Sequence, residues 1–252
     1  MHHDLNNAPR KLLTRGNPKT AKGEKQGILT AIMHLAPHKL GGVGNICPHA
    51  TTGCALACLN TAGRGGIGLD EYGLNTIQVA RIRRTRYWKH HKQEFNAMLY
   101  REIRNFVRYA KRHGFSPAIR LNGTSDIPWE KFEFNGHENV FAAFPDVQFY
   151  DYTKWPIGMR GTIPANYHLT YSLAESNAHH AADALDRGYN VAAVFRTAKS
   201  KPLQSPYNFR GRYRRVIDGD ATDARFTDTG GAIIGLRAKG RAKHDTTGFV
   251  LG

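Results

Sequence analysis

The chain has 252 residues, 40% of them hydrophobic, and a formal net charge of +16 at pH 7. It is long enough to bury a core in one domain, no apolar stretch is long enough to span a membrane, and the first residues are polar and basic rather than signal-like. We therefore expect a soluble intracellular protein without membrane contact, and the charge predicts an anionic partner, either a small molecule or a nucleic acid.

The N-terminal segment differs in composition from the rest of the chain. Residues 1–26 lack apolar periodicity and contain Pro9, Pro18 and several lysines. This composition predicts a basic, flexible arm that is either mobile or draped over the domain. A single α/β domain is expected over residues 27–252. Its first element is the apolar run Ile28–Leu35, which predicts a buried strand.

All three cysteines of the chain follow this strand within one short window, at Cys47, Cys54 and Cys58. Thiolates are soft ligands for zinc, copper(I) and iron–sulfur clusters, and an odd count disfavours a disulfide framework. A structural zinc site usually has four protein ligands, whereas three cysteines on a cubane cluster leave one iron open. The count favours a 4Fe-4S cluster, and zinc with His49 as its fourth ligand is the competing interpretation.

A long helical segment comes next. Residues 74–112 contain neither proline nor glycine and have apolar side chains at helical spacing. They predict one long helix, or two helices joined near residues 89–92, that ends at Gly114. The part from Arg81 to Arg112 is also strongly basic, so its outer face could contact phosphates, with a solvated face as the default interpretation.

Short apolar runs recur through the second half of the chain and predict six more buried strands. They are Ala118–Leu121, Val147–Tyr150, Tyr167–Tyr171, Val191–Phe195, Val216–Ile217 and Ala232–Leu236. Helical segments separate some of them, notably residues 177–187. Seven strands alternating with helices predict an α/β fold, a partial or complete TIM-like (β/α) barrel with the cysteine loop after its first strand.

Polar side chains follow each predicted strand. The carboxyl ends of the parallel strands in an α/β barrel converge on one face, so these side chains are expected to share a site with the cysteines. The catalytic or substrate-binding candidates are Asn122, Asp126, Asp151, Lys154, Arg196 and Asp218. Solvation or helix capping is the alternative for each one singly, as for Asp126 ahead of Pro128. His168 lies within a predicted strand and could face either the barrel centre or the helices.

Four segments carry a family resemblance. Residues 47–65, 120–130, 149–154 and 216–220 are similar to motifs of the bacteriophage gene product 88-like family. The similarity covers the chain from about residue 27 to its end. It implies a phage-encoded protein that works in the cytoplasm of the infected bacterial host.

The position of the cysteine loop also resembles that of radical SAM enzymes, in which three cysteines hold a 4Fe-4S cluster whose open iron binds S-adenosylmethionine. This resemblance implies a radical SAM-like barrel with Cys47, Cys54 and Cys58 as cluster ligands. It also implies that residues 122–126 contact the methionine amino group. The spacing of the cysteines differs from the common radical SAM pattern, and Ala57 stands where that pattern has an aromatic residue, so S-adenosylmethionine binding stays open.

Three functions are consistent with these observations. The first is a phage-encoded iron–sulfur protein with an open iron site, for which a radical SAM-like or other iron–sulfur enzyme activity is an open question. The second is a nucleic-acid-binding protein with a structural zinc or cluster site, whose affinity would fall steeply with salt. The third is an electron-transfer iron–sulfur protein. The sequence does not predict the oligomeric state.

Overall fold

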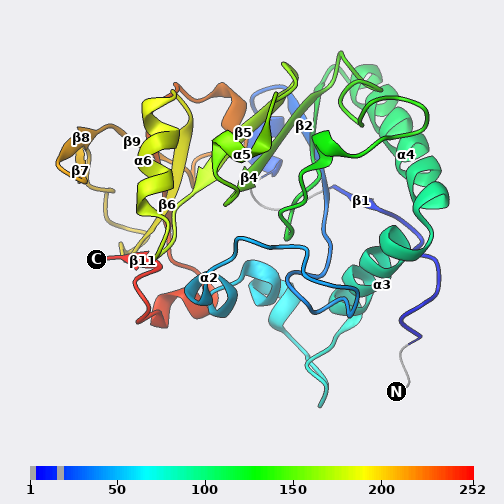
Figure 1. The fold of residues 1–252 in the computed structure, drawn as a ribbon, viewed down its shortest axis with the longest axis horizontal. Helices are drawn as coiled ribbons and strands as arrows, with labels where there is room; N and C mark the ends of the chain where they lie inside the picture. Colours follow the sequence, from blue (N-terminus) through cyan, green and yellow to red (C-terminus); the bar gives the residue numbers. More distant parts are fainter. Residues whose placement is uncertain (1–3, 16–19) are drawn as a thin grey trace.

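The computed structural model describes residues 4–15 and 20–252, and a mostly parallel sheet of nine strands organises this part of the chain (Figure 1). All seven strands predicted from the sequence are present. They are β2 (Ile28–Met33), β3 (Ser116–Arg120), β4 (Gln148–Thr153), β5 (Tyr167–Ser172), β6 (Asn190–Phe195), β9 (Val216–Asp218) and β10 (Ile233–Arg237). Four short strands were not predicted: β1 (Leu13–Thr14), β7 (Tyr207–Phe209), β8 (Arg212–Arg214) and β11 (Val250–Leu251).

The strand order is β1-β2-β3-β4-β5-β6-β10-β9, with β11 also pairing with β6. From β2 to β6 the neighbours are consecutive in the chain and parallel, as in a barrel. The order then changes, because β10 inserts between β6 and β9. Strands β1 and β9 are the two edges of the described sheet, so it does not close. The prediction of a complete barrel is therefore corrected to an open, mixed α/β sheet.

The helical segment 74–112 forms two helices, which confirms the two-helix form of the prediction. Helix α3 (Thr76–His90) begins after Asn75, whose side-chain oxygen accepts from the amides of residues 77 and 78. Helix α4 (Lys92–Arg112) ends before Gly114, which has a left-handed φ of 75°.

Four shorter helices complete the set: α1 (Thr20–Glu24), α2 (Thr52–Leu56), α5 (Ile157–Arg160) and α6 (Ala178–Asp186). Single 3-10 turns are η1 (Leu59–Thr61), η2 (Gly63–Gly66), η3 (Trp129–Lys131), η4 (Arg225–Thr227) and η5 (Gly240–His244). Helix α6 lies within the predicted segment 177–187. Over the described ranges, no helix combines the length and apolar character needed to cross a membrane.

The alternation of side chains along the strands gives the sheet two differently covered faces. On one face, apolar residues of β2 and β3 such as Met33 and Ile119 pack with Phe95 and Ile103 of α4. Helix α6 packs on β5 and β6, at the opposite end of the molecule in Figure 1. The other face carries Tyr150 of β4, which packs with residues 224–226 of the segment between β9 and β10.

His168 belongs to this second face, because it is paired in register with Tyr150. Its side chain is therefore not directed at α6. Burial lowers the pKa of His168, and the positive charge of Arg225 lowers it further. His168 is therefore a half-buried histidine whose neutral form is favoured.

The described part of the N-terminal arm is attached to the domain. Leu12 is fully buried, and β1 pairs antiparallel with β2. The carboxylate of Glu102, on α4, accepts hydrogen bonds from the amides of Leu12 and Leu13 at 2.8–3.1 Å. Residues 1–3 and 16–19 of the predicted arm lie outside the described residues.

We expect Glu102→Ala to lower the free energy of unfolding by about 2–3 kcal/mol, because two partly buried amides lose a charged acceptor. Denaturant unfolding measures this change. Glu138→Ala, at an exposed site, is the control and should change stability by no more than about 0.5 kcal/mol. Equal effects of the two substitutions would contradict an anchoring role for Glu102.

Candidate functional site at the carboxyl edge of the sheet

The cysteine loop lies directly beyond the carboxyl end of β2. Cys47 is buried in the loop, Cys54 lies in α2, and Cys58 follows this helix; all three are free thiols. The N-cap residue of helix α2 is Thr51, whose hydroxyl accepts from the amide of Cys54 at 3.2 Å. This cap fixes the direction in which α2 leaves the loop.

The three thiols are close enough to influence one another electrostatically. Burial raises the pKa of Cys47 to about 12, and negative charge on Asp126, Cys58 or Cys54 would raise it further. Burial also raises the pKa of Cys58, against the opposing effects of the Asn60 amide, Lys154 and Arg81. The raised pKa of both thiols favours their protonated form unless a cation replaces the proton.

Main-chain amides already point at two of the sulfur atoms. The amide of His38 donates to Sγ of Cys47 at 3.5 Å, and the amide of Asn60 donates to Sγ of Cys58 at 3.5 Å. Such hydrogen bonds stabilise negative charge on sulfur and tune the potential of a bound iron–sulfur centre. These two amides favour the thiolate form of Cys47 and Cys58, although the effect of burial on each pKa is larger.

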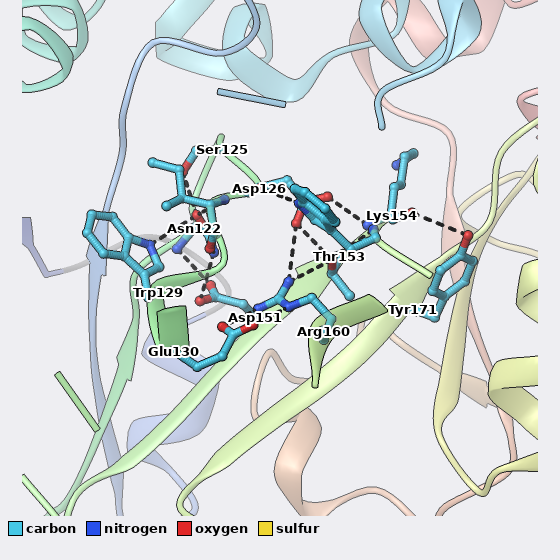
Figure 2. Close-up of polar contacts among 12 residues, drawn as sticks. Asn122, Ser125, Asp126, Trp129, Glu130, Asp151, Thr153, Lys154, Arg160 and Tyr171 are labelled. Atoms are coloured by element: carbon cyan, nitrogen blue, oxygen red, sulfur yellow. Dashed lines mark hydrogen bonds and ion pairs between the residues drawn. The ribbon is translucent and has the colours of Figure 1, made fainter. Parts of the chain in front are cut away.

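The structure brings four of the six predicted polar candidates together at this edge, namely Asn122, Asp126, Asp151 and Lys154 (Figure 2). Asn122 follows β3 and organises the loop after it. Its side-chain oxygen accepts from the Ile127 amide, the Ser125 hydroxyl and the Trp129 indole. Its amide nitrogen donates to Ile127 and Asp151. The side chain of Asn122 is thus fully used inside the protein.

Asp126 connects this loop to the end of β4. Its carboxylate accepts from the main-chain amide of Lys154 at 2.7 Å and from the hydroxyl of Thr153 at 2.8 Å. The N-cap residue of the turn η3 is Pro128, and no side chain caps this turn, so the capping interpretation of Asp126 is wrong. Burial raises the pKa of Asp126, although the Lys154 amide and the Arg160 guanidinium favour its charged form.

Arg160 balances the buried negative charge. Its guanidinium is fully buried and makes a two-point contact with the carboxylate of Glu130, at 2.7 and 2.8 Å. It also donates to the hydroxyl of Thr153 and lies 3.7 Å from a carboxylate oxygen of Asp126 (Figure 2). This ion network fixes the floor of the site.

Lys154 is the cation that faces the cysteine loop. Its ammonium donates to the hydroxyl of Ser172 at 2.8 Å and lies 5.6 Å from the centre of the Phe249 ring. It forms no ion pair with a carboxylate of the described residues. Its charge lowers the pKa of Cys58 and of His38. Lys154 is therefore placed to hold an anion beside the thiols.

Asp151 lies beneath this surface and is almost completely buried. It accepts from the main-chain amide of Asn122 at 2.8 Å and from the hydroxyl of Tyr167 at 3.1 Å. Burial raises its pKa to about 7, against the favourable charge of Arg120.

The remaining two candidates lie elsewhere. Arg196 donates to the carbonyls of Lys243 and Asp245 and so fixes the segment before β11. Asp218 is exposed at the edge strand β9, where it pairs with Arg237 at 2.9 Å. Neither contacts the other four candidates, because β9 is at the far edge of the sheet and Arg196 turns toward the C-terminal segment.

Sequence reasoning did not rank Glu175, which joins the cysteine helix to the end of β5. Its carboxylate accepts from the Thr51 hydroxyl at 2.7 Å and from the Gly53 amide at 2.6 Å. A side chain on Gly53 would collide with Thr247, Glu175 and Phe249. The position of Glu175 just after a predicted strand indicated a possible site residue. Its contact with Gly53 could not be predicted, because the two residues lie far apart in the sequence.

Arg81 of α3 was also missed as a site residue. Its guanidinium donates to the main-chain and side-chain oxygens of Asn60, both at 2.6 Å, next to Cys58. Burial lowers the pKa of Arg81 to about 10, whereas negative charge on Cys58 would raise it. A second cation therefore lies beside the cysteine loop.

His49, the proposed fourth zinc ligand, packs edge-on against Trp155 with ring centres 4.3 Å apart. Across residues 4–15 and 20–252, no three His, Cys, Asp or Glu side chains are arranged to hold a metal ion. The observed side-chain positions therefore do not support a zinc site.

Comparison with known proteins places the chain in a family. Residues 11–251 match the family described as Gene product 88, so this protein belongs to that family of bacteriophage proteins. No curated protein and no solved structure matches the chain significantly. The match includes the cysteine loop and all of the strand ends described above.

The first prediction for the site concerns pH. Because the pKa of Asp151 rises from 3.8 to about 7 on folding, its protonated form favours the folded state. Its contribution to stability is complete below about pH 4 and is lost as the pH rises to about 7. The difference in unfolding free energy, wild type minus Asp151→Asn, should fall by about 1.4 kcal/mol per pH unit in this window. A pH-independent difference from denaturant titrations would refute the shift.

The second prediction concerns the carboxylate that holds α2. Glu175→Gln should speed hydrogen exchange at the Gly53 amide by about tenfold or more, because a charged acceptor contributes about 1.5–3 kcal/mol. Exchange measured by mass spectrometry tests this. Glu71→Gln, on the exposed loop before α3, is the matched control and should leave residues 51–58 unchanged.

Proposed function

We propose that this protein binds a 4Fe-4S cluster through Cys47, Cys54 and Cys58, with one iron open to an anionic small molecule. The observation that carries the proposal is the convergence of these three free thiols at the carboxyl edge of parallel strands, beside Lys154. The carboxyl edge of such a sheet is where α/β proteins generally place their ligand sites.

The proposal of a cluster rather than a zinc ion rests on the count of three thiols, since a structural zinc ion usually takes four protein ligands. Among the described residues no three His, Cys, Asp or Glu side chains are arranged to hold a metal ion, and this finding favours neither centre. The two N–H donors to sulfur and the two nearby cations, Lys154 and Arg81, suit the negative charge of such a centre.

A bound cluster would supply one-electron transfer and an open coordination position. The protein contributes recognition and charge: Lys154, held by Ser172, is available to pair with a carboxylate or phosphate of the bound molecule. Asp126 orients Lys154 through its main-chain amide. A radical SAM-like enzyme working in the host cytoplasm is the more specific form of this proposal. Asn122 does not support it, because its side-chain amide is already fully hydrogen-bonded.

The decisive measurement is iron, sulfide and zinc content after anaerobic purification, with electron paramagnetic resonance of the reduced protein with and without S-adenosylmethionine. We expect about four iron and four sulfide per chain. Zinc without sulfide would overturn the proposal. A spectrum that does not change when S-adenosylmethionine is added would rule out the radical SAM form of the proposal. If the protein then converts no small molecule, electron transfer would be the function that is left to the cluster.

Substitution of single cysteines tests the ligand assignment. Cys54→Ala should lose most of the iron and sulfide, because the proposal makes Cys54 one of only three ligands and its removal leaves two. Leu56→Ala, on the same helix and with its side chain 60% exposed, is the control and should keep full content. Full iron and sulfide content in Cys54→Ala would refute this residue as a ligand.

A further inference from the structure

The basic segment Arg81–Arg112 divides into two parts with different roles. On α3, four arginines donate to main-chain carbonyl oxygens of the arm and of the loops near the site. They are Arg81, Arg83, Arg84 and Arg86. These guanidinium groups hold the fold together and have few donors left for a partner.

On α4 the arrangement is the reverse. Five cationic side chains are exposed and, within the part of the chain that the structure describes, none pairs with a carboxylate: Arg101, Arg104, Arg108, Lys111 and Arg112. At 100° per residue they fall within an arc of about 100°, and they extend over about 16 Å of helix. We call these five residues the α4 basic stripe. The only acidic residue among them in sequence, Glu102, is turned inward to bind the arm.

Several other basic groups of the surface pair with carboxylates close by. Arg212 and Arg214 both pair with Asp186, and Arg237 pairs with Asp218. Lys239 pairs with Asp220. The α4 basic stripe is thus a continuous row of exposed cations without carboxylate partners among the described residues. Helix α4 itself lies at the rim of the molecule (Figure 1).

We infer that the α4 basic stripe binds the phosphate backbone of double-stranded nucleic acid. Successive turns of a helix place cations about 5–6 Å apart, and a row of arginines matches a row of phosphates in both charge and hydrogen-bonding geometry. This surface is separate from the cysteine loop, so the inference does not depend on the proposed cluster.

The stripe lacks the features needed to bind a single strand. Single-stranded nucleic acid is held largely by stacking of its bases on exposed aromatic rings. The exposed aromatic ring beside the stripe, Tyr109, is stacked with His113 at 4.1 Å and covered by the guanidinium of Arg15, also at 4.1 Å. Arg15 instead adds a sixth cation near the end of the stripe.

The stripe also lacks a group for reading bases. Asn105 is the only amide side chain between Arg101 and Arg112, and its oxygen accepts from Arg108 at 2.6 Å. Contacts from arginine and lysine to phosphates position a protein on a duplex without selecting a sequence. Binding at the stripe is therefore independent of sequence.

The test is fluorescence anisotropy of a labelled duplex DNA across a salt series, with the full-length protein. A triple variant, Arg101→Gln, Arg104→Gln and Arg108→Gln, removes three cations with little effect on helix propensity. The control variant removes three exposed cations elsewhere, Lys199→Gln, Lys201→Gln and Arg241→Gln, and has the same net charge. Circular dichroism melting confirms that both variants are folded.

We expect wild-type affinity to fall with salt with a log–log slope of about −4 to −5, since each phosphate contact contributes about −0.9. The α4 variant should lose about tenfold or more in affinity near 0.1 M salt and should reduce the slope by about 2–3. The control should change affinity by less than the α4 variant at every salt concentration. Equal losses in the two variants, tighter binding of single strands than of duplex, or no duplex binding would each overturn the inference.

Discussion

The buried carboxylate of Asp126 is the interaction on which the arrangement of the site depends. Its oxygens bind the end of β4, at Thr153 and the Lys154 amide, and its own amide donates to Ile46 in the cysteine loop at 3.0 Å. One residue therefore joins the segments that follow three different strands. A buried charge of this kind is stable only if its hydrogen-bonding capacity is filled and a countercharge lies close, which Arg160 provides at 3.7 Å.

Arginine has two different roles in this strongly basic chain. Arg84 of α3 and the buried Arg160 donate to carbonyl and carboxylate oxygens at sites away from solvent, where the planar, multiply donating guanidinium is more suitable than an ammonium group. Arginines of α4 face solvent without such partners. Net charge alone could not separate these roles, because it counts both groups equally.

Much of the framework could be predicted from local sequence. Apolar runs predicted the seven main strands, and the absence of glycine and proline predicted α3 and α4, because burial patterns and helix spacing are local properties. The order of β9 and β10 could not be predicted, since pairing between strands depends on long-range packing.

At the site, strand ends predicted that Asp126 and Lys154 would meet. Arg196 and Asp218 also follow predicted strands, but their side chains contact other parts of the protein. Glu175 contacts Gly53, which is far away in the sequence, so its role could not be predicted from its own position.

Strand β11 pairs with β6 at Val194 and Phe195, just beyond the point where β5 stops pairing with it. Because β10 occupies the other edge of β6, β11 fills the space that opens between β5 and β6. The residues immediately before it, Thr247 and Phe249, press against Gly53 beside Cys54. The cysteine loop is thus packed by a segment that the ribosome synthesises almost a whole domain later. During translation the loop therefore stays uncovered after most of the sheet has been made, and α2 reaches its final packing only when β11 pairs with β6.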